Sequence, residues 1–185
     1  MDRGAQSYRR FLLGDDSGIV EIVTDYKDGL ILYLNSLVNN IQIAEELTED
    51  TFFRLMIKKP VFSGKSSFKS WLYAIGRNIA VDYVRKASRQ FSLPPEDMDA
   101  YLSDKAELEK PYVREERKTM IHSAMEKLPP DYRQIIWLIY FEEFSNEEAG
   151  QIMKKNSRQI RNLLYRAKQS LRTELEKEGL TYEEY

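Results

Sequence analysis

The chain has 185 residues, with 30 acidic and 28 basic side chains, a formal net charge of −2 and no cysteine. This length allows one domain or two small ones, and an apolar share of 42% supplies enough side chains for packed cores. The lack of cysteine excludes a disulfide framework, thiol catalysis and the usual zinc ribbons. No apolar run approaches the length of a bilayer crossing, and the first residues lack a signal-peptide pattern. We therefore expect no membrane span and a cytoplasmic location.

The first half of the chain has the periodicity of helices. Apolar residues recur at three- and four-residue steps over residues 15–39, where Asp28-Gly29 is a candidate interruption, and over residues 43–58. In the second of these helices Leu47, Phe52, Leu55 and Met56 are expected to face inward. Proline and glycine then predict a loop over residues 59–65, and a long helix follows over residues 67–89.

The composition changes after this helix. Residues 91–110 contain six acids and two lysines, and a Pro-Pro pair opens the stretch. Helical periodicity returns over residues 114–128 and, after a second Pro-Pro pair, over residues 131–144. The pattern predicts an all-α chain of two small helical domains joined by an acidic flexible linker. We place these parts at residues 1–90, 91–113 and 114–185.

A helix-turn-helix is predicted near the C-terminal end. Ser145 and Glu148 match the S-x-x-E capping box, so a short helix is expected over residues 146–153. A polar turn follows, and Ser157 is a candidate cap of a longer helix. The small pair Ala149-Gly150 would let the two helices cross closely. In this motif the second helix enters the major groove of DNA.

The second helix of this motif is strongly basic. Residues 154–172 carry seven basic side chains and no acid, although the whole chain is net negative. A stretch of charge opposite to the background is typical of a phosphate-binding surface. Its apolar residues, from Ile160 to Leu171, recur at helical spacing. The alternative is an ordinary helical hairpin whose lysines and arginines are only solvated.

A second basic block lies in the first half. Residues 58–89 contain eight basic side chains and one acid, with aromatic residues between them. Cations neutralise phosphates and aromatic faces stack on exposed bases, so the block suits an unpaired strand. Alternatively, Phe68, Trp71 and Tyr83 belong to the core, an explanation that fits the loop residues Phe62 and Lys65 less well.

The helix before this block has an acidic side, formed by Glu45, Glu46, Glu49 and Asp50, with Arg54 one turn further on. Such a face does not suit DNA, but it suits a protein partner with a basic surface. The alternative is a solvated helix face.

Three other functions stay open at this point. A conventional helix-turn-helix regulator would dimerise and bind a palindromic duplex alone. A pure adaptor would bind a protein without DNA. A helical enzyme lacks candidate residues, because His122 is the single histidine and no glycine-rich phosphate motif is present. We expect no catalytic activity, cofactor or metal.

Taken together and in this order, the residues resemble a bacterial sigma factor of the extracytoplasmic-function (ECF) group, which lends promoter specificity to RNA polymerase. The resemblance covers about residues 19–175. It rests on residues 44–52 and 62–86, on Leu128-Pro129-Pro130-Asp131-Tyr132-Arg133, on the helix-turn-helix and on residues 164–168. It implies sigma domain 2 in residues 1–90, an acidic linker in residues 91–113 and sigma domain 4 in residues 114–185.

The resemblance also implies functional positions. The melted non-template strand of the −10 element would be bound by Lys59, Phe62, Ser63, Gly64, Lys65, Ser66, Tyr73, Arg77, Asn78, Arg85 and Lys86. The −35 duplex would be read by Ser157, Arg158, Gln159, Arg161, Asn162, Tyr165, Arg166 and Lys168, of which Arg158 and Gln159 are included on geometry. Core polymerase would be bound by Glu46, Glu49, Asp50 and Arg54.

The partners implied are core RNA polymerase, through its clamp helices and flap, and promoter DNA. An anti-sigma factor is a further candidate that the sequence neither requires nor excludes. One departure concerns the turn, where the family normally has a glycine near Lys154, so the geometry of the turn stays open.

Overall fold

The computed structural model describes residues 2–91 and 116–179, and all of the regular secondary structure among them is helical. The first half contains α1 (Arg3–Leu12), α2 (Ser17–Val38), α3 (Ile41–Lys58) and α4 (Phe68–Phe91). The second half contains α6 (Glu116–Glu126), α7 (Pro130–Ile136), the π-helical turn η2 (Trp137–Phe141), α8 (Asn146–Met153) and α9 (Ser157–Lys177). The all-α expectation is confirmed. The predicted linker falls almost entirely outside the described residues.

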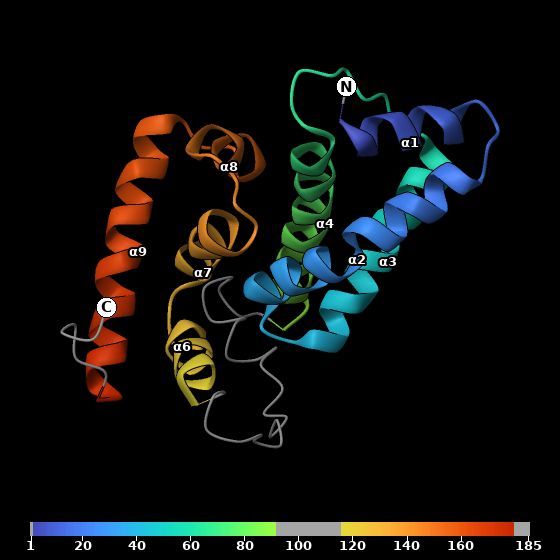
Figure 1. Ribbon diagram of the computed structural model, residues 1–185. Helices are drawn as coiled ribbons and strands as arrows, with labels where there is room; N and C mark the ends of the chain where they lie inside the picture. Colours follow the sequence, from blue (N-terminus) through green and yellow to red (C-terminus); the bar gives the residue numbers. More distant parts are fainter. Residues whose placement is uncertain (1, 92–115, 180–185) are drawn as a thin grey trace.

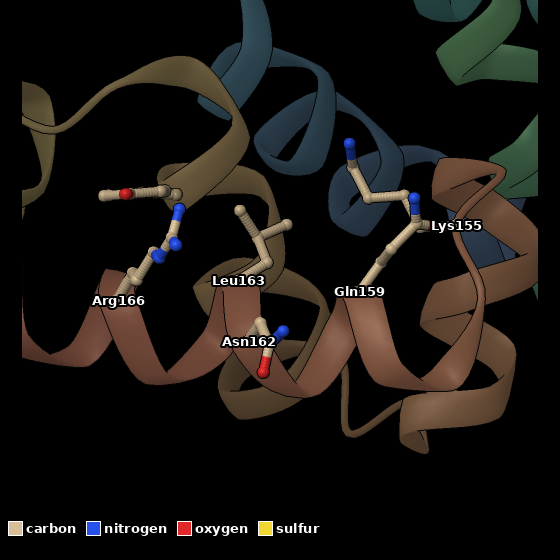
Figure 2. A pocket seen from close by; sticks show the side chains of 6 residues that line it. Lys155, Gln159, Asn162, Leu163 and Arg166 are labelled. Atoms are coloured by element: carbon tan, nitrogen blue, oxygen red, sulfur yellow. The ribbon is translucent and has the colours of Figure 1, made fainter.

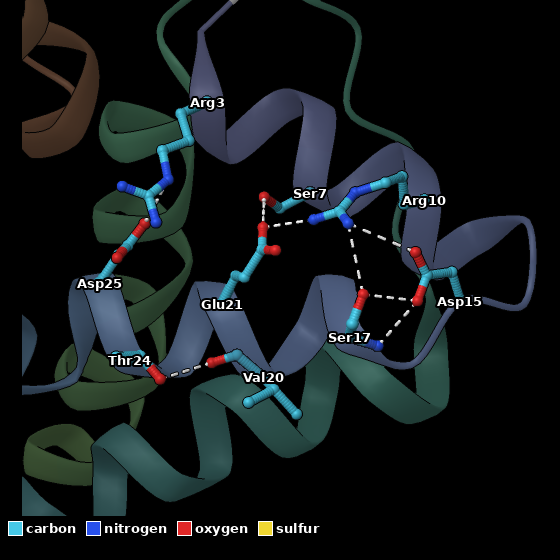
Figure 3. Close-up of polar contacts among 9 residues, drawn as sticks. All are labelled: Arg3, Ser7, Arg10, Asp15, Ser17, Val20, Glu21, Thr24 and Asp25. Carbon is cyan, nitrogen blue, oxygen red and sulfur yellow. Dashed lines mark hydrogen bonds and ion pairs between the residues drawn. The ribbon is translucent and has the colours of Figure 1, made fainter.

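The helix α1 was not predicted from the sequence, and polar contacts hold it on α2 (Figure 3). The Asp2 side chain caps it by accepting a hydrogen bond from the Ala5 backbone N–H at 2.7 Å. Ser7 donates to the Glu21 carboxylate at 2.6 Å, and Arg10 pairs with the same carboxylate. Hydrogen bonds from Arg10 and Ser7 lower the pKa of Glu21, so this carboxylate stays charged at neutral pH.

The helix α2 runs without a break through Gly29, so the interruption considered at Asp28-Gly29 is wrong. A glycine inside a helix costs about 1 kcal/mol relative to alanine. The apolar face around it offsets this cost, because Leu30, Tyr33 and Leu34 are fully buried. Packing therefore overrides the local preference.

The helix α3 packs against α2 and α4 through Leu47, Phe52 and Leu55, which are buried as predicted. Met56 is 39% exposed, so its predicted inward position is wrong. The inward stripe of α3 is narrower than the sequence pattern suggested.

The helix-turn-helix is formed by α8 and α9. The predicted capping box is confirmed: the Ser145 hydroxyl accepts from the Glu148 N–H at 3.2 Å, and the Glu148 carboxylate accepts from the Ser145 N–H at 3.0 Å. The cap of α9 is Asn156 rather than Ser157, and it forms a second capping box with Gln159. Lys154 ends α8 with a left-handed backbone at φ 55°, so the turn forms here without glycine.

The predicted helix over residues 131–144 is helical only as far as Phe141. After α7 the chain widens into η2, where the Glu142 N–H bonds to the Trp137 carbonyl at 3.1 Å. This wider turn stacks the rings of Trp137 and Phe141 at a centroid distance of 4.3 Å. It also directs the chain from Glu142 to Phe144 towards the first half.

The two halves pack on each other (Figure 1). The helix α4 contacts α8, and α2 contacts α7, while α9 lies beyond α7 on the side away from the first half. Apart from Ala87, their buried apolar residues form one contiguous cluster. Among residues 2–91 and 116–179, no helix combines the length and apolar character needed to cross a membrane.

The close approach at Gly150 yields a stability prediction. A Cβ at this position would lie 2.7 Å from the Lys155 carbonyl oxygen, a backbone atom of the turn. We expect Gly150→Ala to lower the free energy of unfolding by about 1–3 kcal/mol, because this strain outweighs the gain in helix propensity. Urea unfolding measures the change. The exposed neighbour Gln151 gives the control, Gln151→Ala, and an equal effect of both substitutions would contradict the close packing of the motif.

Candidate nucleic-acid interface

The basic helix α9 separates its apolar and cationic residues. Ile160 and Ala167 are fully buried, and Leu163, Leu164 and Leu171 pack beside them. This confirms the predicted apolar face. The opposite side carries exposed predicted −35 residues, namely Ser157, Arg158, Gln159, Arg161, Asn162, Tyr165, Arg166 and Lys168. The helix therefore presents a continuous cationic and polar surface of the kind that binds duplex DNA.

A shallow groove of about 230 Å³ runs along α9. Figure 2 shows side chains of α9 following one another along it, with Lys155 reaching in from the turn. Lys155 is fixed by an ion pair with Asp131 at 3.2 Å. Lys155 belongs to the basic stretch that the sequence indicated, whereas Tyr132, which lies on α7, and the apolar Leu163 were not expected to line a groove. The lining consists of Tyr132, Lys155, Gln159, Asn162, Leu163 and Arg166.

Two further predicted residues of α9 stand near its middle. Tyr165 is 66% exposed, so its ring is available to a partner. The Lys168 ammonium lies 5.2 Å from the centre of the Tyr140 ring, within cation–π range. Lys168 is therefore already held by the protein on one side.

The loop between α3 and α4 turns outward at its middle. Ser63, Gly64 and Lys65 are exposed, and Gly64 has φ 72°, a conformation that glycine adopts without strain. Phe62 is half-buried, with its ring centre 5.2 Å from Trp71 and 5.6 Å from Phe68. Phe62 therefore anchors the loop in an aromatic cluster. Phe68 is fully buried, which confirms the core alternative for that residue.

The helix α1 and its capping residue Asp2 contact this loop at both of its ends. The Tyr8 hydroxyl donates to the Pro60 carbonyl at 2.8 Å, and its ring lies 5.4 Å from Trp71. Burial raises the pKa of Tyr8 to about 12, so the phenol keeps its proton at neutral pH. Asp2 also accepts from the Phe68 N–H at 2.8 Å, so one carboxylate caps both α1 and α4. The loop is thus braced at both of its ends.

The predicted −10 residues on α4 have different surroundings. Tyr73 is 1% exposed and hydrogen-bonds to Glu142, and Arg77 hydrogen-bonds to Gln134. Both residues therefore contact the second half of the chain. Asn78 is half-buried. Arg85 and Lys86 are exposed, and Arg85 pairs with Asp82 at 2.7 Å. The part of α4 nearest the loop is therefore covered.

The outer face of α3 is mixed rather than simply acidic. The predicted polymerase contacts Glu46, Glu49, Asp50 and Arg54 are all exposed. The sequence reasoning missed Phe53 and Ile57 beside them, which are 58% and 60% exposed. Together with Arg54, Lys58 and Pro60 they line a groove of about 450 Å³. An indication was present in the sequence, since α3 has more apolar residues than one inward stripe needs.

No group of histidine, aspartate and glutamate among residues 2–91 and 116–179 is arranged to hold a metal ion. His122 instead lies beside the rings of Trp137 and Phe141, at centroid distances of 6.2 and 6.3 Å.

Two parts of the chain match known protein families. Residues 22–90 match the family described as Sigma-70 region 2, and residues 118–171 match Sigma-70, region 4. The ECF RNA polymerase sigma factor SigM of Bacillus subtilis is 30% identical over 154 residues, which cover 83% of this chain and 93% of SigM. The chain belongs to the ECF sigma factors.

Other relatives agree with this assignment. SigW of Bacillus subtilis is 28% identical over 170 residues, covering 88% of this chain and 91% of SigW. Among solved structures, the sigma factor RpoE from Bartonella quintana, in complex with the anti-sigma factor NepR, superposes with a TM-score of 0.67 at 25% identity. The superposition covers 84% of this chain and 95% of RpoE. As a sigma factor, the protein acts in transcription initiation with RNA polymerase at promoters.

In this sigma factor α1 lies before the residues that match region 2, yet it contacts the loop of that region. We expect Tyr8→Phe to lower the free energy of unfolding by about 0.5–1.5 kcal/mol, because it removes the hydrogen bond to Pro60. Amide hydrogen exchange should also rise over residues 61–67. Tyr140→Phe, at an exposed tyrosine, is the matched control. Unchanged loop exchange in Tyr8→Phe would show that α1 does not brace the loop.

Proposed function

We propose that this sigma factor directs core polymerase to promoters by reading a −35 duplex with α9 and a melted −10 non-template strand with the loop at residues 59–66 and α4. The observation that carries the proposal is the presence of two separate basic surfaces, one in each matched sigma region. The protein would act in the cytoplasm. It would bind polymerase and promoter DNA and would carry out no covalent chemistry. Its parts would be domain 2 (residues 1–90), a linker (91–113) and domain 4 (114–185).

At the −35 element, the exposed arginines of α9 would contact bases and phosphates in the major groove. An arginine pairs with two groups of a guanine, and an asparagine with two groups of an adenine. Arg161 and Asn162 stand next to each other on the exposed side of the helix. Lys155 and Tyr132, which line the shallow groove along α9, would extend the contact with DNA beyond this helix.

At the −10 element, the loop would receive a base flipped from the non-template strand. Unstacking a base costs a few kcal/mol, which stacking in the protein offsets by roughly 1–3 kcal/mol per base. The exposed loop residues Ser63, Gly64 and Lys65 are available to the base and its phosphate. The aromatic cluster would keep the loop in shape while it binds.

Core polymerase would dock on α3. The exposed Phe53 and Ile57 supply apolar area, and Glu49, Asp50 and Arg54 surround them with charge. An apolar centre with a polar rim is the usual anatomy of a protein–protein interface. The clamp helices and flap of polymerase are the proposed partners. An anti-sigma factor is a further proposed partner, because RpoE was solved with one.

In vitro transcription with core polymerase and a library of promoters tests the proposal. The protein should yield transcripts from a subset of promoters that share −35 and −10 elements. A gel shift without polymerase separates the main alternative, since tight binding to a palindromic duplex by the protein alone would favour a conventional regulator.

The −35 contacts are tested at Arg161 and Arg166, both exposed on α9. We expect Arg161→Ala and Arg166→Ala each to weaken −35-dependent binding by roughly 1–3 kcal/mol, with a shallower salt dependence where the lost contact is to a phosphate. Arg172→Ala is the control, because Arg172 pairs with Glu176 at the far end of the same helix. If both test variants bind like the control, the recognition surface is misassigned.

The −10 contact is tested at Asn78 on α4. Asn78→Ala should reduce promoter opening and leave the affinity for core polymerase unchanged, because the side chain is proposed to read the flipped base and does not line the groove on α3. Opening is followed by the fluorescence of 2-aminopurine in the −10 element. Equal losses of opening and core binding would refute the assignment.

A further inference from the structure

The helix α1 is joined to both ends of the loop between α3 and α4. At the entry of the loop, the Tyr8 hydroxyl donates to the Pro60 carbonyl at 2.8 Å. At its exit, one oxygen of the Asp2 carboxylate accepts from the Phe68 N–H at 2.8 Å, while the other caps α1 by accepting from the Ala5 N–H at 2.7 Å. Because both groups belong to one helix and its cap, the helix fixes the two ends of the loop relative to each other.

The same helix packs against the aromatic cluster that anchors the loop. The Tyr8 ring centre lies 5.5 Å from Phe68 and 5.4 Å from Trp71, and these two rings also contact Phe62. A Cβ on Gly4, one turn earlier on α1, would lie 2.5 Å from the Phe68 ring. The contact between α1 and the cluster is therefore close enough to require glycine at this position.

A third contact reaches a residue that is proposed to bind the −10 strand. The Lys59 ammonium lies 5.0 Å from the centre of the Phe11 ring, near the end of α1, within the range of a cation–π interaction. Lys59 ends α3 with a left-handed backbone at φ 43°, so the chain turns sharply as it enters the loop. The side chain at this turn is thus held by α1.

The middle of the loop is exposed to solvent. Val61 is 86% exposed, and Ser63 and Lys65 are exposed as well. A Cβ on Gly64 would meet no atom within 4 Å. The shape of this exposed stretch therefore depends on how its two ends are held.

The helix α1 is itself fixed on α2 (Figure 3). Glu21 of α2 binds both Ser7 and Arg10, and Arg3 pairs with Asp25 at 3.3 Å. These contacts lie on α2 and not on the loop, so they hold α1 in place independently of the loop. The helix can therefore act as a fixed support.

We propose that α1 is a positioning element for −10 recognition: Asp2 and Tyr8 hold the loop at residues 59–66 in the shape that receives a base flipped from the non-template strand. A loop that already has its bound shape loses less conformational entropy when it binds. This inference rests on the function proposed above. It extends the −10 site to a helix that lies before residues 22–90, the segment that matches Sigma-70 region 2.

The experiment separates positioning of the loop from general stabilisation of the fold. The test variant is Asp2→Ala with Tyr8→Phe, which removes the hydrogen bonds at both ends of the loop. The control is Ser7→Ala, which removes the hydrogen bond to Glu21 on the same helix and leaves the loop contacts in place. Both variants should lower the free energy of unfolding, which is measured in urea.

Strand binding is measured with each variant bound to core polymerase. The probe is a single-stranded −10 oligonucleotide, taken from a promoter that the parent complex opens, with 2-aminopurine at the flipped position. The affinity of the test variant should fall about tenfold, as expected when the loop has its binding shape in only about a tenth of the population. Ser7→Ala should bind the probe like the parent. The affinities of both variants for core polymerase and for a −35 duplex should not change.

Asp2→Asn gives a milder second measurement. Asparagine caps a helix about as well as aspartate does, but its side chain has one acceptor oxygen in place of two. We therefore expect α1 to stay capped while the Phe68 N–H loses its partner. The loss of probe affinity should be smaller than in the test variant and larger than in Ser7→Ala.

Equal probe affinities of the test variant, Asp2→Asn and Ser7→Ala would overturn the positioning role of α1, and so would equal losses of −10 and −35 binding. The proposed function would survive either result, because the parent complex still opens the promoter from which the probe is taken. Failure of the parent complex to open any promoter would instead remove the proposed function, and the positioning role with it.

Discussion

The arrangement of the two halves depends on one buried cation. Arg133, which is 2% exposed, donates to the carbonyls of Glu126 and Leu128 in its own half and to the Ser36 carbonyl near the end of α2. A guanidinium is fully ionised at neutral pH and costs much free energy to bury unless its donors are paired. The carbonyls at the ends of α6 and α2 supply acceptors, so the position of α7 on the first half is specified by hydrogen bonds as well as by apolar contact.

This placement decides which surfaces of the sigma factor are available. With α7 fixed against α2, η2 directs Glu142 onto Lys69 and Tyr73, and α8 brings Glu148 to the start of α4. The same packing places α9 beyond α7, and the basic residues of α9 and the outer face of α3 are exposed. One set of contacts therefore engages Tyr73 and Arg77, two of the proposed −10 residues, while the loop at Ser63–Lys65 and the proposed duplex and polymerase surfaces stay exposed.

Local patterns predicted the local features well. The capping box of Ser145 and Glu148, the bounds of α8 and the apolar face of α9 involve residues only three or four positions apart. The features that were missed depend on distant partners. The helix α1 is held by contacts of Tyr8 with Pro60 and Phe68, and the cover of Tyr73 comes from Glu142, 69 positions away. The sequence also could not separate inward from outward apolar residues on α3, because Phe53 and Ile57 resemble core residues until the packing is known.

The most direct test of the account is permanganate probing of promoter DNA, which detects unstacked thymines. Core polymerase and this protein are mixed with promoters selected from the library, and each component is also tested alone. The account predicts reactive thymines in the −10 element only when both are present. If no promoter becomes reactive with both, while the same core polymerase opens DNA with another sigma factor, the account is contradicted.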